Sequence, residues 1–369
     1  MLRTRSDLPS SVAVVIQTWP SSTATVSLLN HCRSSGPSVR SVPAAEVEEA
    51  VVSQVRHLLR TPEIIARGYD ARFLRMWHYY LAYCEAGFAI RVDHNVANAS
   101  VKAPELTIDE MEHRIDEKMA PVAALGYNAQ WPGPTIRVTE GDKVRAIFKN
   151  NLKETTGVHF HGIDFDNFFM DGVPFVTQLP IPPGETFTYE FVANPAGSMM
   201  YHSHHNATDQ VGRGLLGAFI IDPKEPTVKY DREYIWISND TLGGFTINGH
   251  GFPAVVPVLA AVGETVLIRY MNEGIMMHPW HSHGYTQRVV ARDGRPLGTA
   301  EFDCDTLGVN PGERFDVTIT AERPGIWAFH CHILPHVEGL NGMFGMVTTL
   351  IVVPEKSDID AIYKALGVG

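Results

Sequence analysis

Between about residue 104 and residue 355, the chain consists of short runs in which apolar and polar residues alternate, separated by Pro and Gly. The runs Val144–Phe148, Phe187–Phe191 and Val266–Tyr270 carry an apolar residue at every second position. Successive side chains of a β-strand point to opposite faces, so each run predicts a strand that is buried on one face. Many short strands of this kind are typical of antiparallel β-sandwiches, and we predict an all-β fold.

Residues 1–103 differ in composition from the rest of the chain. They begin with a segment rich in Ser, Thr and Pro, and the pattern of the following residues Glu46–Leu59 predicts a helix. The segment Gly68–Arg91 resembles the C-terminal end of cyclopropane-fatty-acid synthases. This resemblance covers only a tail, and no Gly-rich cofactor loop accompanies it. We therefore predict an appended extension, helical or poorly structured, without methyltransferase activity.

An internal repeat predicts the domain organisation. Residues 141–162 align without a gap on residues 263–284, and residues 183–204 align without a gap on residues 311–332. The chain is therefore expected to contain two copies of one β-sandwich, at 104–225 and 226–356, followed by a tail at 357–369.

Four His-x-His pairs occupy equivalent places in the two repeats. The pairs are His159/His161, His202/His204, His281/His283 and His330/His332. Residues i and i+2 of a strand share a face, so each pair presents two imidazoles in one direction. With 17 histidines in the chain, chance would give roughly one such pair. The pairs therefore predict a metal site rather than ordinary structural histidines.

The face on which these histidines lie follows from their neighbours. Cys331 shares its parity with the bulky Trp327 and Phe329, whereas His330 and His332 point the other way. We expect Cys331 to face the sandwich core and the histidines to face outward, toward the equivalent surface of the other repeat. Eight converging imidazoles would bind a metal cluster, since imidazole suits Cu, Zn, Fe and Ni.

The second repeat carries an additional set of ligands, His278, Cys331 and His336. Two histidines and one cysteine form a blue-copper centre when a weak axial Met completes it. The repeat alignment places Thr156, Ser203 and Thr208 at the corresponding positions of the first repeat. Only the second domain is therefore predicted to hold this copper. Cys331 is bonded in sequence to His330 and His332, which gives an electron on its sulfur a short covalent route to the cluster.

At this point the chain resembles the multicopper oxidase family. The motifs are HFHG at 159–162, YHSH at 201–204, HPWHSHG at 278–284 and HCHILPH at 330–336, in the family order. The resemblance implies two cupredoxin-like Greek-key domains and four coppers per chain, with reduction of O2 to water. It implies a type 1 copper on His278, Cys331 and His336, a type 2 copper on His159 and His281, and a type 3 pair on His161, His202, His204, His283, His330 and His332.

The single type 1 site in the second domain resembles the small, two-domain laccases. That resemblance implies a homotrimer in which domain 1 of one chain meets domain 2 of the next. A monomer whose own two domains face each other is the alternative. Laccase-like oxidation of phenols is the leading prediction, and oxidation of a metal ion such as Cu(I), Mn(II) or Fe(II) is the alternative. A copper nitrite reductase fits less well, because it would carry the type 1 site in the first domain and lack this full set of outward His pairs. A non-catalytic copper-binding protein is a further alternative, which blue absorbance and O2 uptake would exclude.

The axial ligand departs from the family pattern, which places it five positions after the second type 1 histidine, at Asn341. We predict Met343 as the axial ligand, with a loop longer by two residues, because a weak thioether is the usual arrangement. Leu340 is the alternative, and it would leave the copper three-coordinate.

The sequence identifies the acidic residues that would supply protons less clearly than it identifies the metal ligands. Asp171, in the sequence MDGVPF, matches an acid that the resemblance assigns to proton delivery near the type 2 copper; a turn Asp before Gly172 is the alternative. The family's other acid, inside HCHxE, is replaced by Leu334. His205 is interpreted as a surface or supporting residue, and His113 and His250 as ordinary residues.

Charge and composition narrow the partners. The formal net charge of -11 argues against nucleic acid or an anionic membrane, since phosphate binding needs clustered Lys and Arg. The apolar runs are too short to span a membrane. Four cysteines without regular spacing do not predict a disulfide framework. No export signal is recognisable, whereas the habit of the family favours the periplasm or the exterior.

Overall fold

The computed structural model of the chain describes residues 13–18, 24–29, 101–116, 118–241, 244–359 and 362. The chain divides into two compact units, Met1–Phe88 and Ala89–Gly369. In the first unit, β1 (Ala13–Thr18) pairs antiparallel with β2 (Ala24–Leu29), a pair that the sequence pattern did not predict. The predicted helix at 46–59 and the segment at 68–91 lie outside the described residues.

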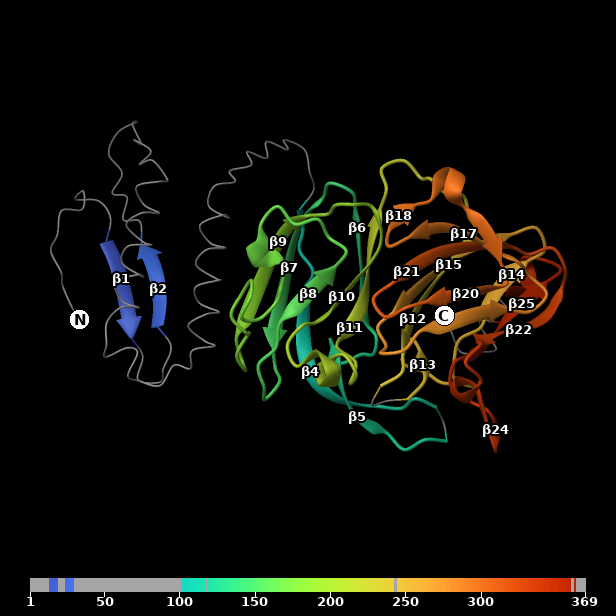
Figure 1. Ribbon diagram of the computed structural model, residues 1–369, viewed down its shortest axis with the longest axis horizontal. Coiled ribbons are helices and arrows are strands. Elements are labelled where there is room, and N and C mark those ends of the chain that lie inside the picture. Colours follow the sequence, from blue (N-terminus) through green and yellow to red (C-terminus); the bar gives the residue numbers. More distant parts are fainter. Residues whose placement is uncertain are drawn as a thin grey trace. The chain divides into compact units, whose positions relative to one another are not determined.

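Domain 1 is a sandwich of two sheets (Figure 1). Its strands are β3 (Val101–Lys102), β4 (Glu105–His113), β5 (Val122–Tyr127), β6 (Gly133–Thr139), β7 (Lys143–Asn150), β8 (Val158–His161), β9 (Thr186–Val192), β10 (Gly197–Ser203) and β11 (Leu216–Asp222). The β7 sheet has the order β3-β7-β4-β5, with β9 also paired to β7, and the β8 sheet has the order β6-β11-β10-β8.

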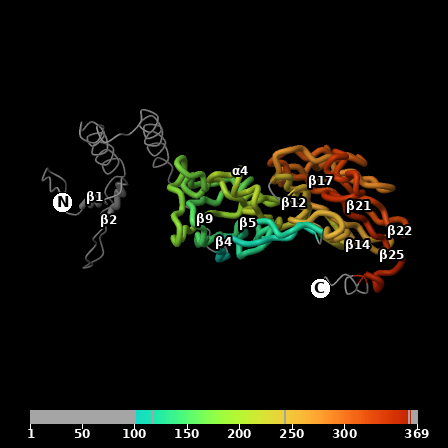
Figure 2. Tube along the Cα trace, turned by 90° about the horizontal axis from the view of Figure 1, so that it is seen from below, coloured from blue at the N-terminus to red at the C-terminus, as the bar shows by residue number. Residues whose placement is uncertain are grey.

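Domain 2 repeats this arrangement in the C-terminal half of the second unit (Figures 1 and 2). Its strands are β12 (Arg232–Asn239), β13 (Thr246–Ile247), β14 (Val258–Ala261), β15 (Thr265–Asn272), β16 (His278–Ser282), β17 (Gln287–Arg292), β18 (Arg295–Pro296), β19 (Phe302–Cys304), β20 (Thr306–Val309), β21 (Arg314–Thr320), β22 (Gly325–Cys331), β23 (Glu338–Gly339), β24 (Gly342–Met343) and β25 (Val347–Val353). The β15 sheet has the order β13-β12-β15-β21-β17-β18, with β19 also paired to β17, and the β22 sheet has the order β14-β25-β22-β16-β20. The prediction of an all-β fold of two sandwiches is confirmed.

Helical segments within the described residues are short. They are η1 (Phe168–Met170), α4 (Ala207–Gln210), η2 (Gly298–Ala300) and η3 (Leu334–His336), and residues 357–359 and 362 are helical as well. None of the helices in this part of the chain has the length and apolar composition that a membrane span requires.

Aromatic side chains fill the space between the two sheets of domain 1. The rings of Phe148, Phe160, Tyr189, Tyr201 and Phe219 are fully buried. Several meet edge to face; the Phe148 and Tyr189 centroids, for example, lie 5.8 Å apart. This packing fixes β8 and β10 against the core, so the residues that alternate with these rings must face outward.

The two domains contact each other through the outer faces of the β8 sheet and the β15 sheet. An apolar layer joins them, comprising Ala124, Trp131, Met200, Leu216, Ala218, Ile220, Ile237 and Met271. Ser198 and Met200 belong to the same face of β10 as His202, and Met271 lies on the outer face of β15. The outward face of domain 1 is thus partly covered by its own domain 2.

A buried charge network lies in the same interface. The Arg269 guanidinium Nη1 lies 2.9 Å from Asp316 Oδ2 and donates to Ser198 Oγ at 2.9 Å. Ser198 in turn donates to Asp316 Oδ1 at 2.6 Å, and Arg269 Nε donates to Glu233 Oε1 at 2.7 Å. Loss of Arg269 would leave the buried Asp316 carboxylate without its ion-pair partner. The network therefore holds the two domains of one chain in a fixed relation.

The predicted strand alternation is confirmed in β7 and incomplete in β15. In β7, Val144, Ala146 and Phe148 are buried and the residues between them are more exposed. In β15, Leu267 and Arg269 are buried as well as the core-facing residues. The reason is that the outer face of β15 packs on domain 1, so this strand is buried on both faces.

Burial of the Glu273 carboxyl, directly after β15, makes stability depend on pH. Its Oε1 atom is buried and has no hydrogen-bond partner among the described residues. Burial raises the pKa of Glu273 from 4.5 to about 8. Between these values the folded chain retains a proton that the unfolded chain releases, so the free energy of unfolding falls as pH rises. The residue is only half-buried, so water reduces the effect of the shift. We expect the free energy of unfolding to fall by about 2 kcal/mol less in Glu273→Gln than in the wild type over this pH range.

Urea unfolding of the metal-free protein between about pH 5 and pH 8 measures the effect. Glu355→Gln, at an exposed position, is the control and should retain the wild-type slope. An equal slope in the Glu273→Gln and Glu355→Gln variants would contradict this account.

Candidate copper sites

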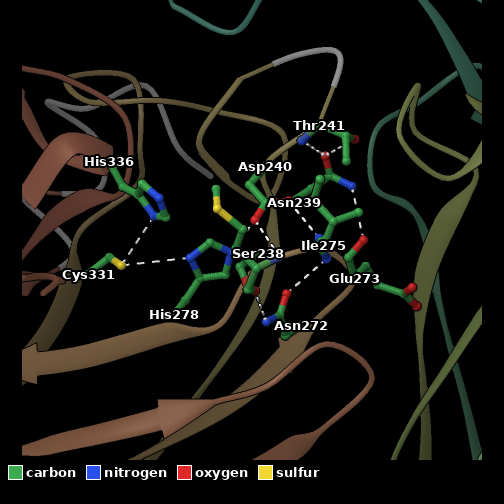
Figure 3. Close-up of polar contacts among 12 residues, drawn as sticks. Ser238, Asn239, Asp240, Thr241, Asn272, Glu273, Ile275, His278, Cys331 and His336 are labelled. Carbon is green, nitrogen blue, oxygen red and sulfur yellow. Dashed lines mark hydrogen bonds and ion pairs between the residues drawn. The ribbon is translucent and has the colours of Figure 1, made fainter. Parts of the chain in front are cut away.

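One candidate site lies at one end of the domain 2 core and comprises His278, Cys331 and His336 (Figure 3). The Nδ1 atoms of His278 and His336 each lie 3.7 Å from Cys331 Sγ. The three residues come from β16, β22 and η3 and are at most 3% exposed. His336 also stacks on Phe245, with ring centroids 4.1 Å apart. The predicted type 1 residues are therefore brought together.

The chemistry of these side chains fits a copper ion. Two imidazole nitrogens and one sulfur converge in a dry environment, which is the donor set of a blue-copper site. Burial raises the pKa of the Cys331 thiol to about 11. Without a metal the thiol therefore keeps its proton at neutral pH, and a bound cation would displace it.

The predicted axial residue, Met343, does not fit this site. It lies on the β23–β24 hairpin, where its side chain is 59% exposed, and Leu340 on the same hairpin is fully exposed. Met346, three residues further on, is fully buried in the core cluster that includes Cys331. Its backbone N–H donates to His336 O and its carbonyl accepts from Cys331 N, both at 3.0 Å. The hairpin lengthens the loop, so the methionine that lies beside the site comes later than the sequence pattern predicted.

In domain 1, the side-chain amide of Gln210 occupies the place that corresponds to the His2Cys site of domain 2. Thr156 and Ser203 are fully buried and both donate to Gln210 Oε1, at 2.8 Å and 2.6 Å. Thr208, which the repeat alignment placed third, is exposed on α4. Gln210 therefore takes the third place, and its hydrogen bonds satisfy the polar groups that a metal would otherwise bridge.

Four histidines of domain 1 gather on the outer face of the β8 sheet. His159 and His161 come from β8, and His202 and His204 from the end of β10, with His159 paired to His202 in register. Neighbouring ring centroids lie 5.3 to 6.2 Å apart. Ligand nitrogens of His159, His161 and His202 lie within 4.8 Å of one another. We call these four residues the domain 1 histidine set.

The domain 2 histidine set comprises His281, His283, His330 and His332. His281 pairs with His330 across β16 and β22. Ring centroids lie 4.9 to 5.7 Å apart, and the Nε2 atoms of His283 and His330 approach to 3.0 Å. Because Phe329 and Cys331 of β22 lie in the core, these histidines face away from it, as predicted.

Backbone carbonyls fix which nitrogen each ring presents. A carbonyl only accepts, so a ring nitrogen facing one must carry the proton and leave Nε2 free for a metal. His159 Nδ1 donates to Asp171 O at 2.6 Å, and His281 Nδ1 donates to Asp305 O at 3.0 Å. His202 and His330 donate in the same way to the carbonyl of the following residue, both at 2.9 Å. Four of the eight rings are thus oriented for metal binding.

Two rings of the domain 1 histidine set are held neutral. Burial lowers the pKa of His161 to about 4, with the nearby Arg314 guanidinium adding to the effect. Burial, followed by the charge of His159, lowers the pKa of His202 to about 3. Neutral imidazole is the form that binds a metal, so these sites are ready at neutral pH.

The two histidine sets of one chain lie on opposite sides of the domain 2 core. Domain 1 contacts domain 2 through the outer face of the β15 sheet. The domain 2 histidine set lies on the outer face of the other sheet, the β22 sheet, with the core between them. The eight imidazoles therefore do not converge within one chain.

Three other histidines of the described residues, His113, His205 and His250, have structural partners. His205 Nε2 lies 2.8 Å from Thr155 Oγ1, which agrees with a supporting role. The His113 ring, from β4 of domain 1, lies 4.8 Å from Trp131 and 5.2 Å from His250, and its Nε2 lies 2.6 Å from Gly249 O in domain 2. These rings contribute to the contact between the domains.

Sequence reasoning missed Asp240, whose carboxylate Oδ2 lies 3.1 Å from His278 Nε2. Burial acts to raise the pKa of Asp240, but the contact with His278 and the hydrogen bonds from two backbone N–H groups lower it below its ordinary value. Asp240 follows β12, 38 residues before His278, and no spacing rule connects the two.

The fold and the two kinds of histidine site define a copper protein built from paired cupredoxin-like domains, and family comparison agrees. Multicopper oxidase family models match residues 107–226 and 228–354. The chain therefore belongs to the multicopper oxidase family.

Individual relatives support this assignment. The chain is 41% identical over 229 residues to the iron transport multicopper oxidase FET3 of Candida albicans, covering 55% of this chain and 36% of that protein. It is 31% identical over 230 residues to a putative laccase-1 of Oryza sativa, covering 54% of this chain and 39% of that protein. The crystal structure of a blue copper oxidase from Nitrosomonas europaea matches with a TM-score of 0.65 and 32% identity, over 69% of this chain and 86% of that one. The chain thus spans well under half the length of these two curated relatives.

Proposed function

We propose that this protein is a laccase-like copper oxidase that couples one-electron oxidation of a donor to the four-electron reduction of O2 to water. The observation that carries the proposal is the position of Cys331. Its sulfur lies in the buried His2Cys site, while the residues on either side, His330 and His332, belong to the outward histidine set. Bound copper would supply the one-electron redox chemistry and the site at which O2 is reduced.

The ligand assignment follows the geometry. For the type 1 copper we propose His278, Cys331 and His336, with Met346 in place of Met343 as the axial residue. For the type 2 copper we propose His159 and His281. The type 3 pair would use the other histidines of both sets, which are His161, His202, His204, His283, His330 and His332.

Asp171 is proposed to hold a proton beside the type 2 position. Its carbonyl orients His159, and its carboxylate Oδ1 lies 3.4 Å from His159 Nδ1. The side chain is 32% exposed, so it can exchange protons with water. Leu334, where the family resemblance places a second acid, is 56% exposed and offers no proton.

A homotrimer is proposed because the domain 2 core separates the histidine sets of one chain. Each set needs a partner surface, and another copy of the chain carries the complementary set. A head-to-tail contact between domain 1 of one chain and domain 2 of the next closes into a ring. The monomeric alternative would require the domains to leave the interface at which Ser198 of domain 1 bonds to Arg269 and Asp316 of domain 2.

The donor is proposed to be a phenol or a similar small aromatic molecule. The surface beside the buried trio exposes apolar side chains on two loops, including Ile275 and Met276 before His278 and Met343 and Phe344 after His336. Metal-ion oxidation is the second candidate, favoured by similarity to a protein whose name describes iron transport. An exported location is also proposed, on the family resemblance alone.

Copper analysis and a donor screen test the proposal. We expect four coppers per chain after loading, intense blue absorbance and O2 uptake driven by a phenolic donor. Two or fewer coppers per chain would contradict the assignment. Steady-state O2 uptake with phenols, Cu(I), Mn(II) and Fe(II) separates the two classes of donor.

A further inference from the structure

The Asp240 carboxylate is buried directly behind His278, on the side of the ring away from Cys331 (Figure 3). Its side chain is fully buried, as is that of His278, and Oδ2 lies 3.1 Å from His278 Nε2. His278 Nδ1, on the opposite side of the ring, faces Cys331 Sγ at 3.7 Å. The imidazole therefore lies between a carboxylate and the sulfur of the proposed type 1 site.

The loop before His278 binds this carboxylate through its backbone N–H groups. The backbone N–H of Ile275 donates to Asp240 Oδ1 at 2.7 Å, and that of Met276 donates to Oδ2 at 2.9 Å. A Cβ atom at Gly274 would lie 2.6 Å from Asp240 Oδ1, so a side chain at this position would displace the carboxylate. Asn272 holds the loop from its other side, because its Nδ2 donates to Met276 O and Val309 O at 2.8 Å and 2.9 Å.

The contacts of Asp240 differ from those of the acids that lie beside Arg269 at the domain interface. Asp316 and Glu233 lie against Arg269, whose positive charge compensates theirs. The polar contacts found for Asp240 in the described part of the chain are two backbone N–H groups and His278. Its negative charge is therefore directed toward the imidazole and, through it, toward a metal on Nδ1.

We propose that Asp240 is a positioning residue for the type 1 copper, which orients His278 and lowers the reduction potential of the site. This proposal rests on the proposed function, because it requires copper on His278. A carboxylate that accepts from the outer nitrogen of a metal-binding imidazole fixes its tautomer and makes it a more basic ligand. A fixed negative charge near the metal also favours Cu(II) over Cu(I), since Cu(II) carries the larger positive charge.

The test is the reduction potential of the type 1 copper in Asp240→Asn, measured by optical redox titration of the copper-loaded protein. Asparagine keeps the shape and can still accept one hydrogen bond, but it removes the charge. We expect retained copper content, retained but shifted blue absorbance, and a reduction potential more positive than that of the wild type. An unchanged potential in a fully loaded variant would overturn the proposal.

Asp231→Asn is the matched control. Asp231 is an exposed acid of the same domain, whose Oδ2 accepts from Thr265 N at 2.8 Å, and it begins the segment leading into β12. Removing its charge should leave the potential and the absorbance band unchanged. Equal shifts in both variants would show a general charge effect and would overturn the assignment to Asp240.

A second variant covers the possibility that Asp240→Asn does not fold. Gly274→Ala retains the charge but displaces the carboxylate, because the new Cβ would occupy the space next to Oδ1. We expect a smaller positive shift of the potential with copper still bound, and no shift in that variant would count against the proposal. A wild-type protein without blue absorbance after copper loading would instead show that the proposed function has failed.

Discussion

Changing Cys331 to serine is expected to abolish the blue absorbance and to lower donor oxidation by more than about 100-fold. Loss of a residue that only supports a metal ligand already costs about 10- to 100-fold, and Cys331 is proposed as a ligand itself. A serine hydroxyl is a poor ligand for copper beside two imidazoles, and it removes the sulfur that joins the buried site to His330 and His332. The domain 2 histidine set faces away from the core and should still bind metal.

The measurements for this variant are the visible spectrum, copper content and O2 uptake with a phenolic donor. We expect about one copper fewer per chain, without loss of the fold. Cys304→Ser is the control, because Cys304 is the other free cysteine in the described residues and lies half-buried on β19. It should keep both colour and activity. Persisting blue absorbance in Cys331→Ser would refute the proposed role.

Two inactive variants are expected to restore activity when they assemble together. Variant A carries His159→Ala and His161→Ala, and variant B carries His281→Ala and His283→Ala. Each alone lacks two of the eight histidines of every cluster and should be inactive. In a mixed ring, domain 1 of B meets domain 2 of A, so an intact cluster forms. With random mixing we expect about a quarter of the wild-type activity, because each contact has one chance in four of this pairing.

Adding Cys331→Ser to one partner determines the direction of the contact. In variant B the extra change should be harmless, because the restored cluster uses Cys331 of A. In variant A it should abolish the recovery. Co-expression with different affinity tags verifies that mixed oligomers are present. A persistently inactive mixture in such oligomers would rule out clusters shared between chains.

Much of the site could be predicted from local rules. The two-residue period of a strand places His330 and His332 on one face and Cys331 on the other, and the structure has them so. The internal repeat gave two sandwiches and the absence of a second His2Cys set in domain 1. These features depend only on neighbouring residues or on a comparison of the chain with itself.

Other features could not be predicted from the sequence because they depend on the path that a loop takes. The choice of Met343 assumed that the loop after His336 is longer by two residues, whereas the β23–β24 hairpin extends it and leaves Met346 as the buried thioether. Gln210 replaced Thr208 for a related reason, since α4 turns the chain so that the last residue of the helix points inward. The gapless alignments between the two repeats end before both of these loops, so they could not place the residues within them.

The sequence by itself determined that the chain forms strands, that these strands repeat as two sandwiches, and which face of each strand carries histidine. Strand periodicity is a property of the backbone and needs no distant partner. Only the tertiary structure decided that β15 is buried on both faces, that Asp240 lies behind His278, and that the domain 2 core separates the two histidine sets of one chain. Each of these depends on which sheet of domain 2 packs against domain 1, and that choice is made by apolar area and buried charges contributed by residues far apart in the sequence.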